Sequence, residues 1–453
     1  MTAILGTVLT STYDTFSFQS DKKVPAGTFV ATPLGDDAFL LGRVTEAKAS
    51  RLDATIYEAD ILRRGGPGKD GGFDFSAPDE LADPGAEVYA PPLKAAAAAL
   101  GLDADPAKSL FVGRAGDLDV CLRPESLFRH VFVGGTTGSG KSHFAGVLVE
   151  ELAKLHLPAV VIDSQAEYLD LARSLGGKAV EPGRDYAVPL SSLTTEEAAR
   201  MVAALESAAA RDLFMFSFSA LQAEITAGRR SGFGLKDLLR RMEQEGLHAL
   251  RMDGYELRVA MARVEASIKR HRFLGAKEFN LDWAVLLKSG KPAAVDCSSL
   301  DMLQLQLVVG ATMRELQRLR AAGKVPPFVL FLDEAHLLVP AEGDAPCKQV
   351  IRECVRVGRH YGIGVVLITQ NPMDVDRKTI AQCNTRAIFA LEPDQLAVLR
   401  GIKADAAPSV LRGLPKFPRG TCLLTGTYET VRHAVVVRVR ERFFAGRGVF
   451  PCS

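Results

Sequence analysis

Gly135-Thr-Thr-Gly-Ser-Gly-Lys141-Ser142 is the stretch that decides the fold, because it matches the full phosphate-binding pattern G-x-x-x-x-G-K-[ST]. The apolar run Val131–Val133 precedes it and predicts a buried strand. The residues from His143 onward carry apolar side chains at helical spacing. Strand, glycine loop and helix are the context that the pattern requires. An ordinary glycine turn is the alternative, and the match at every fixed position disfavours it.

The chemistry of phosphate binding explains the residue types in this loop. Glycines let backbone N–H groups surround phosphate oxygens, and the helix N-terminus adds the positive end of its dipole. We expect Lys141 to contact the β- and γ-phosphates of ATP, and the Ser142 hydroxyl to bind Mg²⁺. The predicted nucleotide-binding residues are Gly135, Thr136, Thr137, Gly138, Ser139, Gly140, Lys141, Ser142 and His143.

A second motif supplies two adjacent carboxylates. The apolar run Phe328–Leu332 predicts a buried strand, and Asp333 and Glu334 follow it. Asp333 is expected to hold Mg²⁺ directly or through water, and Glu334 to orient and deprotonate the attacking water. A solvated acidic strand end is the alternative, which the phosphate loop in the same chain disfavours. Switch-type P-loop proteins commonly lack the second carboxylate, so Glu334 favours sustained hydrolysis.

Three further residues are candidates for the same reaction. Gln370 follows the apolar strand Val365–Thr369 and is placed to sense the γ-phosphate, although a strand-end amide can also be plain polarity. Arg359 lies in an arginine-rich helical stretch and is the preferred arginine supplied in trans to a neighbouring subunit, which requires an oligomer. Arg129 is the second candidate for that role. A surface ion pair is the alternative for both arginines.

Composition is that of a soluble globular protein, with 47% hydrophobic and 24% charged residues among 453. The sequence shows neither a membrane-spanning apolar run nor a signal-peptide layout. Seven cysteines form no C-x-x-C pair, which argues against a disulfide framework or a zinc site and favours the reducing cytoplasm. A net charge of +1 leaves a local basic channel for nucleic acid possible.

The chain is expected to fold as α/β, with a RecA-like P-loop ATPase core, an inserted helical bundle and a small N-terminal β-barrel. Short Val-, Thr- and Phe-rich runs separated by turns predict the barrel, and helices alternating with apolar strands predict the core. The expected parts are a β-barrel at 1–120, core at 121–190, helical insertion at 191–290, core again at 291–425, and a C-terminal strand and arm at 426–453.

Local sequence signals predict further detail within the β-barrel and the helical insertion. The glycine-rich segment 63–72 predicts a flexible loop with a solvated charged tip. Thr194-Thr-Glu-Glu197 predicts a capping box at the start of the helical insertion. Several amphipathic runs predict helices, including Ala198–Ala209, Leu235–Glu245 and Tyr255–His271.

Taken together, the motifs resemble the HerA family of hexameric DNA-translocating ATPases, which is related to FtsK. The resemblance rests on GTTGSGKS, on VID and AEY in 161–168, on LDEAH at 332–336, on GRHYGIG at 358–364, on TQNP at 369–372 and on QCNT at 382–385. One departure is Gln165-Ala-Glu167-Tyr168, where the family often has His-Gly-Glu-Tyr. That change weakens a role for histidine there and leaves Glu167 as the residue to test.

The resemblance implies ATP and Mg²⁺ at Lys141, Ser142, Asp333 and Glu334, with duplex DNA passing through the pore of a homo-hexamer. It also implies a partner, either a NurA-type nuclease in DNA-end resection or another effector, as in antiphage defence. No motif identifies the pore loops; Lys348 and Arg352, after the segment 341–346, are the residues considered for DNA contact.

Other functions remain open at this point. An ATP-dependent assembly switch or scaffold for a partner effector is the main alternative to a motor. A motor for protein or single-stranded DNA usually carries membrane helices, and a metabolic kinase would need an acceptor-pocket motif; the sequence shows neither. Repair or defence, translocation polarity, and unwinding or duplex pumping are not distinguished.

Overall fold

The computed structural model describes residues 4–35, 37–49, 54–68, 72–102, 105–400, 406, 408–426 and 431–444. The chain forms two compact units. The first unit comprises residues 1–151, 370–372 and 383–441, and the second comprises residues 152–369, 373–382 and 442–453. Each unit is described by itself below.

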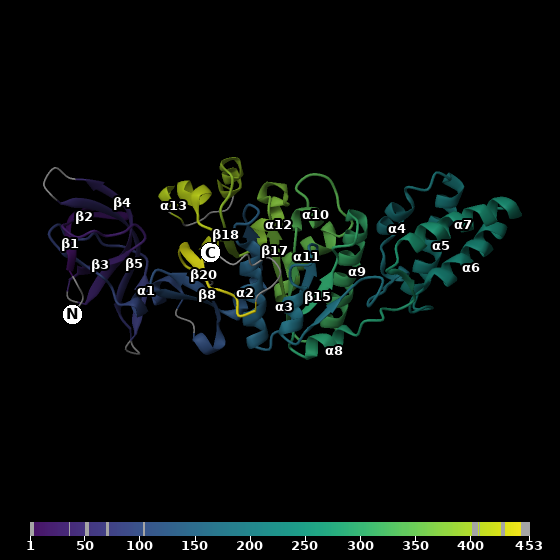
Figure 1. Cartoon of the computed structure of the whole chain (residues 1–453), viewed down its shortest axis with the longest axis horizontal. Coiled ribbons are helices and arrows are strands. Elements are labelled where there is room, and N and C mark those ends of the chain that lie inside the picture. Colours follow the sequence, from purple (N-terminus) through teal and green to yellow (C-terminus); the bar gives the residue numbers. More distant parts are fainter. Residues whose placement is uncertain are drawn as a thin grey trace. The chain divides into compact units, whose positions relative to one another are not determined.

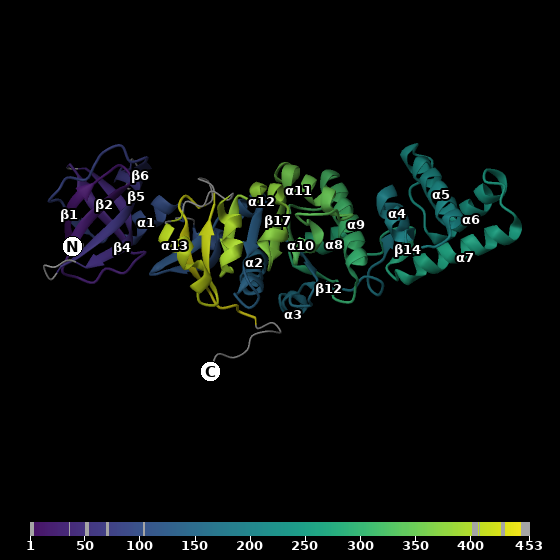
Figure 2. The same ribbon diagram turned by 90° about the horizontal axis from the view of Figure 1, so that it is seen from above.

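The first unit begins with a closed six-stranded β-barrel, drawn in purple in Figures 1 and 2. The pairing runs β2-β1-β7-β3-β4-β5 and returns from β5 to β2, while β6 extends β5 outside the ring. All the pairs are antiparallel. The strands are β1 (Ile4–Ser11), β2 (Thr15–Ser20), β3 (Phe29–Leu34), β4 (Ala38–Ala49), β5 (Thr55–Pro67), β6 (Phe73–Ser76) and β7 (Glu87–Tyr89). The predicted barrel is confirmed.

Apolar side chains at alternate positions along the strands fill the interior of the barrel. In β2, Phe16 and Phe18 are buried while their neighbours face outward, as expected for a strand with one face on a core. The prediction of a loop at 63–72 is wrong for its first half, because Arg63 to Pro67 belong to β5 and pair with β4 and β6. Gly65 allows close aromatic packing there, because a Cβ at this position would meet the Phe39 ring at 2.4 Å. Residues 69–71 lie outside the described part of the chain.

The rest of the first unit is a mixed sheet with the order β10-β18-β19-β20-β8-β9. Only β10 and β18 run parallel, and the other neighbours are antiparallel. The strands are β8 (Leu110–Ala115), β9 (Leu118–Leu122), β10 (Val131–Gly134), β18 (Thr385–Ile388), β19 (Thr421–Thr425) and β20 (Val435–Val439). The helical elements are α1 (Leu93–Leu100), η1 (Pro106–Lys108), η2 (Pro124–Arg129), η5 (Pro393–Arg400), α13 (Pro408–Gly413) and η6 (Leu414–Lys416). The tail 445–453, which includes the end of the predicted arm, lies outside the described residues.

The second unit is built on five parallel strands in the order β12-β15-β11-β16-β17. The strands β11, β16 and β17 are buried along their whole length, as helix-covered parallel strands are. The strands are β11 (Ala159–Asp163), β12 (Lys178–Val180), β15 (Ala293–Asp296), β16 (Phe328–Leu332) and β17 (Ile363–Thr369). The helices are α3 (Leu169–Ser174), α8 (Trp283–Lys288), α9 (Met302–Ala321), α10 (Ala335–Leu338), α11 (Lys348–Tyr361) and α12 (Arg377–Gln382). The predicted parallel α/β architecture is confirmed in this unit. The remaining elements are helix α2 (Lys141–Lys154) and the turn η4 (Pro372–Asp374).

A helical segment is inserted between β12 and β15, as expected. Its three longer helices lie side by side in both views (teal in Figures 1 and 2). The elements are β13 (Val188–Pro189), η3 (Leu190–Ser192), α4 (Thr195–Val202), α5 (Ala208–Thr226), α6 (Leu235–His248), α7 (Gly254–Arg270) and β14 (Leu274–Ala276). The helix expected at Ala198–Ala209 is instead broken, because α4 ends at Val202 and Ser207 caps a new helix by accepting from Ala210 N. Within the described ranges, none of the helices combines the length and apolar character that crossing a membrane needs.

Candidate nucleotide site

The phosphate loop joins β10 to α2, as its sequence predicts. Gly138 and Gly140 have φ of +75° and +118°, which side chains rarely adopt, so the loop depends on glycine at both positions. Lys141 is buried, and its ammonium donates to the Thr136 carbonyl at 2.8 Å. Ser139 donates to the same carbonyl at 2.7 Å. These bonds curl the loop and hold the lysine over it, which is the form that presents N–H groups to phosphates.

Two other segments of the first unit hold the phosphate loop in place through backbone hydrogen bonds. The Thr136 N–H donates to the Ala390 carbonyl at 2.8 Å, and the Gly420 N–H donates to the Ser139 carbonyl at 2.8 Å. A Cβ on Gly135 would meet the Phe389 side chain at 2.6 Å, so only glycine fits there. The phosphate loop is therefore pre-organised by residues far away in the sequence.

Gln370 lies against this loop. The Thr137 hydroxyl donates a hydrogen bond to the side-chain carbonyl of Gln370. An amide in contact with the phosphate loop can respond to what the loop binds, which suits the predicted sensing role. Of the loop residues at the start of α2, Ser142 is partly exposed, and the His143 ring nitrogen Nε2 lies 2.8 Å from the Arg440 carbonyl. His143 thus contributes to the fold through its side chain, a contact that the sequence did not indicate.

The second unit brings Asp333 and Glu334 together after β16. Both residues are buried, at 5% and 6% exposure, so the alternative of a solvated acidic strand end is wrong. Burial raises the pKa of Asp333 to about 7, and the negative charges of Glu334, Asp163 and Glu167 add to that rise. Glu334 has φ of +49°, an unusual value for a residue with a side chain. Such strained backbone is typical of functional positions.

The environment of Asp333 fits a bound cation. A buried carboxylate among other carboxylates is costly, and a hard divalent cation with oxygen ligands offsets that cost. The described residues contain no group of three His, Cys, Asp or Glu side chains arranged to hold a metal alone. Mg²⁺ usually takes one or two protein oxygens and completes its shell with water and phosphate.

The turn after β11 adds contacts that sequence reasoning missed. Ser164 donates to Asp333 at 3.2 Å, and the Gln165 amide donates to Glu334 Oε1. On the other side, His336 Nδ1 lies 3.3 Å from Glu334 Oε2. The departure from the family pattern at Gln165 was visible in the sequence, but its partner was not. Glu167 acts here through its charge, which contributes to the raised pKa of Asp333.

The candidate arginines differ in their surroundings. Arg359 is exposed in the last turn of α11, and no ion pair to it is found in the described part of the chain. Arg129 is half-buried at the end of η2, where its carbonyl accepts from Asn384 N. Arg359 is therefore the better placed of the two for a neighbouring molecule.

The two residues considered for DNA contact are engaged inside the second unit. Arg352 forms a two-point ion pair with Asp376, at 3.1 and 2.6 Å. Lys348 is buried and donates to the Gly343 carbonyl at 2.8 Å. Both side chains therefore hold parts of the second unit together through these contacts.

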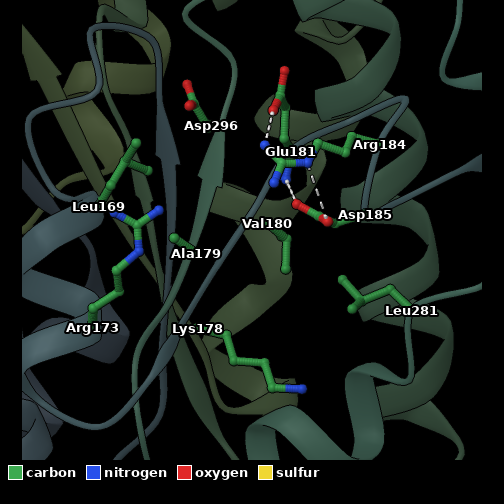
Figure 3. Close-up of a pocket in the computed structure, with 10 residues that line it drawn as sticks. All are labelled: Leu169, Arg173, Lys178, Ala179, Val180, Glu181, Arg184, Asp185, Leu281 and Asp296. Atoms are coloured by element: carbon green, nitrogen blue, oxygen red, sulfur yellow. Dashed lines mark hydrogen bonds and ion pairs between the residues drawn. The ribbon is translucent and has the colours of Figure 1, made fainter.

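A hollow of about 440 Å³ lies elsewhere, at the β12 edge of the second unit's sheet (Figure 3). Arg184 points between Glu181 and Asp185 and lies 3.4 and 3.9 Å from their carboxylates. Arg173, on the opposite wall, pairs with Asp170 at 2.9 Å. Because these arginines are paired and the phosphate loop does not line it, the hollow is not the candidate site.

Comparisons with known proteins agree with this geometry. A family model described as the central domain of helicase HerA matches residues 110–316, and one described as the helicase HerA-like C-terminal domain matches residues 314–417. The DNA double-strand break repair helicase HerA of Sulfurisphaera tokodaii is 22% identical over 343 residues, which cover 71% of this chain and 67% of that protein. The chain thus spans about two thirds of the length of this curated relative.

Solved structures share the fold. VirB4 of Thermoanaerobacter pseudethanolicus has a TM-score of 0.57 at 15% identity, covering 75% of this chain and 98% of that one. The plasmid coupling protein TrwB in complex with ADP and Mg²⁺ has a TM-score of 0.51 at 15% identity, covering 75% of this chain and 91% of that one. These neighbours confirm the P-loop ATPase fold. The two adjoining family matches span residues 110–417, well over half of the chain, and show that this chain belongs to the HerA helicase family.

Proposed function

We propose that this protein is an ATP-driven hexameric translocase or helicase on double-stranded DNA, working with a NurA-type nuclease in DNA-end resection and repair. The observation that carries the proposal is the buried pair Asp333 and Glu334 in a chain that also holds a complete phosphate loop. Membership of the HerA family supports the link to DNA, since a relative carries the name DNA double-strand break repair helicase.

The residues divide the work on ATP as follows. Lys141 and the loop N–H groups bind the phosphates and neutralise charge that develops during transfer. Ser142 and Asp333 are the residues that would hold Mg²⁺, which when bound polarises the phosphate oxygens. Glu334 accepts a proton from the attacking water, and Gln370 reports the γ-phosphate from its contact with Thr137. These roles are assigned from the residue types and from each residue's surroundings.

Completion of the site by a neighbour is part of the proposal. Arg359 is exposed and is found in no ion pair in the described ranges, so it is available to a second copy of the chain. An arginine supplied in trans stabilises the charge of phosphoryl transfer and couples hydrolysis to ring assembly. Duplex DNA would be held by its phosphate backbone, so binding should be insensitive to sequence and sensitive to salt.

We also place the protein in the cytoplasm. The six cysteines in the described ranges are free and buried, which suits a reducing compartment.

Steady-state ATP hydrolysis tests the proposal, measured without nucleic acid, with blunt duplex DNA and with single strands. Duplex DNA should stimulate the wild type, and Glu334→Gln should lower kcat by about 10²- to 10⁴-fold while ATP binding persists. Glu243→Gln is the matched control, because Glu243 is exposed on α6. Hydrolysis indifferent to every nucleic acid would favour an assembly switch or scaffold for a partner effector instead of a motor.

A further inference from the structure

The turn that follows β11 is held in one conformation by a buried carboxylate. Asp163 is fully buried and accepts N–H groups from Gln165 at 3.3 Å, Glu167 at 3.1 Å and Tyr168 at 2.8 Å. Three backbone bonds to one side chain fix the path of the turn relative to β11. The directions of the side chains on the turn are therefore set by the fold of the second unit.

Two consecutive side chains of this turn reach the two carboxylates after β16. Ser164 donates to Asp333, and the next residue, Gln165, donates its amide N–H to Glu334 Oε1. Gln165 itself belongs to the exposed residues, so its side chain has no part in the core. Among the described residues, the side chain of Gln165 makes one hydrogen bond, to Glu334.

The other oxygen of Glu334 also faces a polar side chain. Glu334 Oε2 lies 3.3 Å from His336 Nδ1, and the same nitrogen lies 3.3 Å from the Thr369 hydroxyl at the end of β17. The carboxylate is thus flanked by Gln165 on one side and by His336 on the other. A general base needs a lone pair aimed at the proton that it removes. A donor already on Oε1 occupies a lone pair of the carboxylate that the water proton would otherwise reach.

Unusual backbone conformations occur at both ends of the hydrogen bond between Gln165 and Glu334. Ala166, next to Gln165, has φ of +58°, and Glu334 has φ of +49°. Residues with side chains hold such values only where the surroundings impose them, and they recur in switch regions. A change in either backbone segment would separate the amide from the carboxylate.

We propose that Gln165 is a positioning residue that restrains Glu334 and thereby keeps ATP hydrolysis slow until duplex DNA is bound. The inference rests on the proposed function, in which Glu334 is the general base. In the restrained state Gln165 holds Oε1; when the amide withdraws, Glu334 is released to accept the proton of the attacking water. The device regulates the chemical step and leaves the binding of ATP unchanged.

Two substitutions test the restraint by different means. Gln165→Ala removes the amide, and Gln165→Glu keeps the size of the side chain but replaces the donor with a carboxylate that repels Glu334. For both, kcat without DNA should rise about tenfold, the scale of one hydrogen bond to a charged group. KM for ATP should stay within about twofold, because only the chemical step changes. The ratio of duplex-stimulated to basal rate should fall toward one.

A matched control and a second variant separate the possible outcomes. Gln244→Ala removes an exposed glutamine from α6 and should leave both rates unchanged. A fall in the basal rate of Gln165→Ala would overturn the restraint, since Gln165 would then support catalysis. A wild-type rate in Gln165→Glu would overturn it too, because side-chain size alone would explain the contact. An equal rise with and without DNA would overturn the link to DNA.

The proposed function has its own readout in the same assay. If Glu334→Gln hydrolyses ATP as fast as the wild type, the assignment of the general base fails whatever the Gln165 variants do. If Glu334→Gln is inactive and the Gln165 variants match the wild type, the restraint fails and the function stands.

Discussion

Arg440 donates from Nη2 to Glu151 Oε1 at 2.8 Å, and both side chains are almost completely buried. Its other terminal nitrogen donates to Glu150 at 2.8 Å. The two glutamates lie on α2, whose first residue ends the phosphate loop, and Arg440 directly follows β20. Glu151 also accepts the Phe111 N–H of β8 at 3.1 Å. One guanidinium therefore connects the phosphate-loop helix to two strands of the first unit.

Removing that guanidinium should destabilise the fold strongly. Arg440→Ala leaves two buried carboxylates without their partner, and the free energy of unfolding should fall by about 3–5 kcal/mol. Urea unfolding followed by circular dichroism measures the change. The double variant Arg440→Met with Glu151→Gln removes one of the stranded charges and should recover part of the loss. A loss below about 1 kcal/mol in Arg440→Ala would show that the pair is solvated after all.

Ala166 should be replaceable by glycine with a gain in stability. Its φ of +58° is a left-handed backbone conformation, which is disfavoured by about 1–2 kcal/mol for an L-residue with a side chain. Glycine relieves that cost, although it loses more backbone entropy on folding. Ala166→Gly should therefore raise the free energy of unfolding by roughly 0.5–1 kcal/mol in the same urea measurement.

An alanine in an ordinary helix gives the opposite result. Ala262 is exposed in the interior of α7, and Ala262→Gly should lower the free energy of unfolding by about 1 kcal/mol. If both glycine variants lose stability equally, the left-handed conformation at Ala166 does not exist in solution.

Local signals in the sequence predicted local structure well. The phosphate loop, the strands before and after it, and the capping box of α4 depend on residues a few positions apart. Both bonds of the capping box are present, at 3.2 Å from Glu197 N to Thr194 and 2.8 Å from Thr194 N to Glu197. The same Glu197 also pairs with Arg314 at 2.6 Å. That partner lies 117 residues away, and no local pattern indicates which arginine packs there.

At the candidate site, too, contacts between residues far apart in the sequence could not be predicted. Asp333 and Glu334 were predictable because an apolar strand followed by two carboxylates is a recognisable motif. Their contacts with Ser164 and Gln165 depend on β11 lying beside β16 in register, which places Ile162 opposite Leu332. The strand at 63–67 was missed for a related reason: glycine normally indicates a loop, but here it makes room for Phe39 and Phe75. In both the candidate site and the strand at 63–67, the structure depends on which strands pair with each other. Composition does not indicate that pairing.

The cysteines should be unreactive in the folded protein. Burial raises the pKa values of Cys347, Cys354 and Cys383 to about 12, so the thiolate fraction is small at pH values near 8. Cys452 lies outside the described residues, so the experiment uses Cys452→Ser. We expect no rapid reaction with Ellman's reagent in buffer, and reaction of all remaining thiols in guanidinium chloride. Rapid labelling of the folded variant would contradict the observed burial.

Arg359 should act on the site of a neighbouring subunit. Arg359→Ala alone should lower kcat by about 10³-fold or more if the arginine stabilises phosphoryl transfer, while Arg356→Ala, an exposed change on the same helix, should not. Arg359→Ala retains Glu334, and Glu334→Gln retains Arg359, so a mixed ring contains some complete sites. With random assembly of equal amounts, about a quarter of the interfaces pair an intact Glu334 with a neighbour's Arg359. Steady-state ATP hydrolysis of the exchanged mixture should recover toward that fraction of the wild-type rate. No recovery, although mass spectrometry shows mixed rings, would mean that Arg359 serves its own subunit.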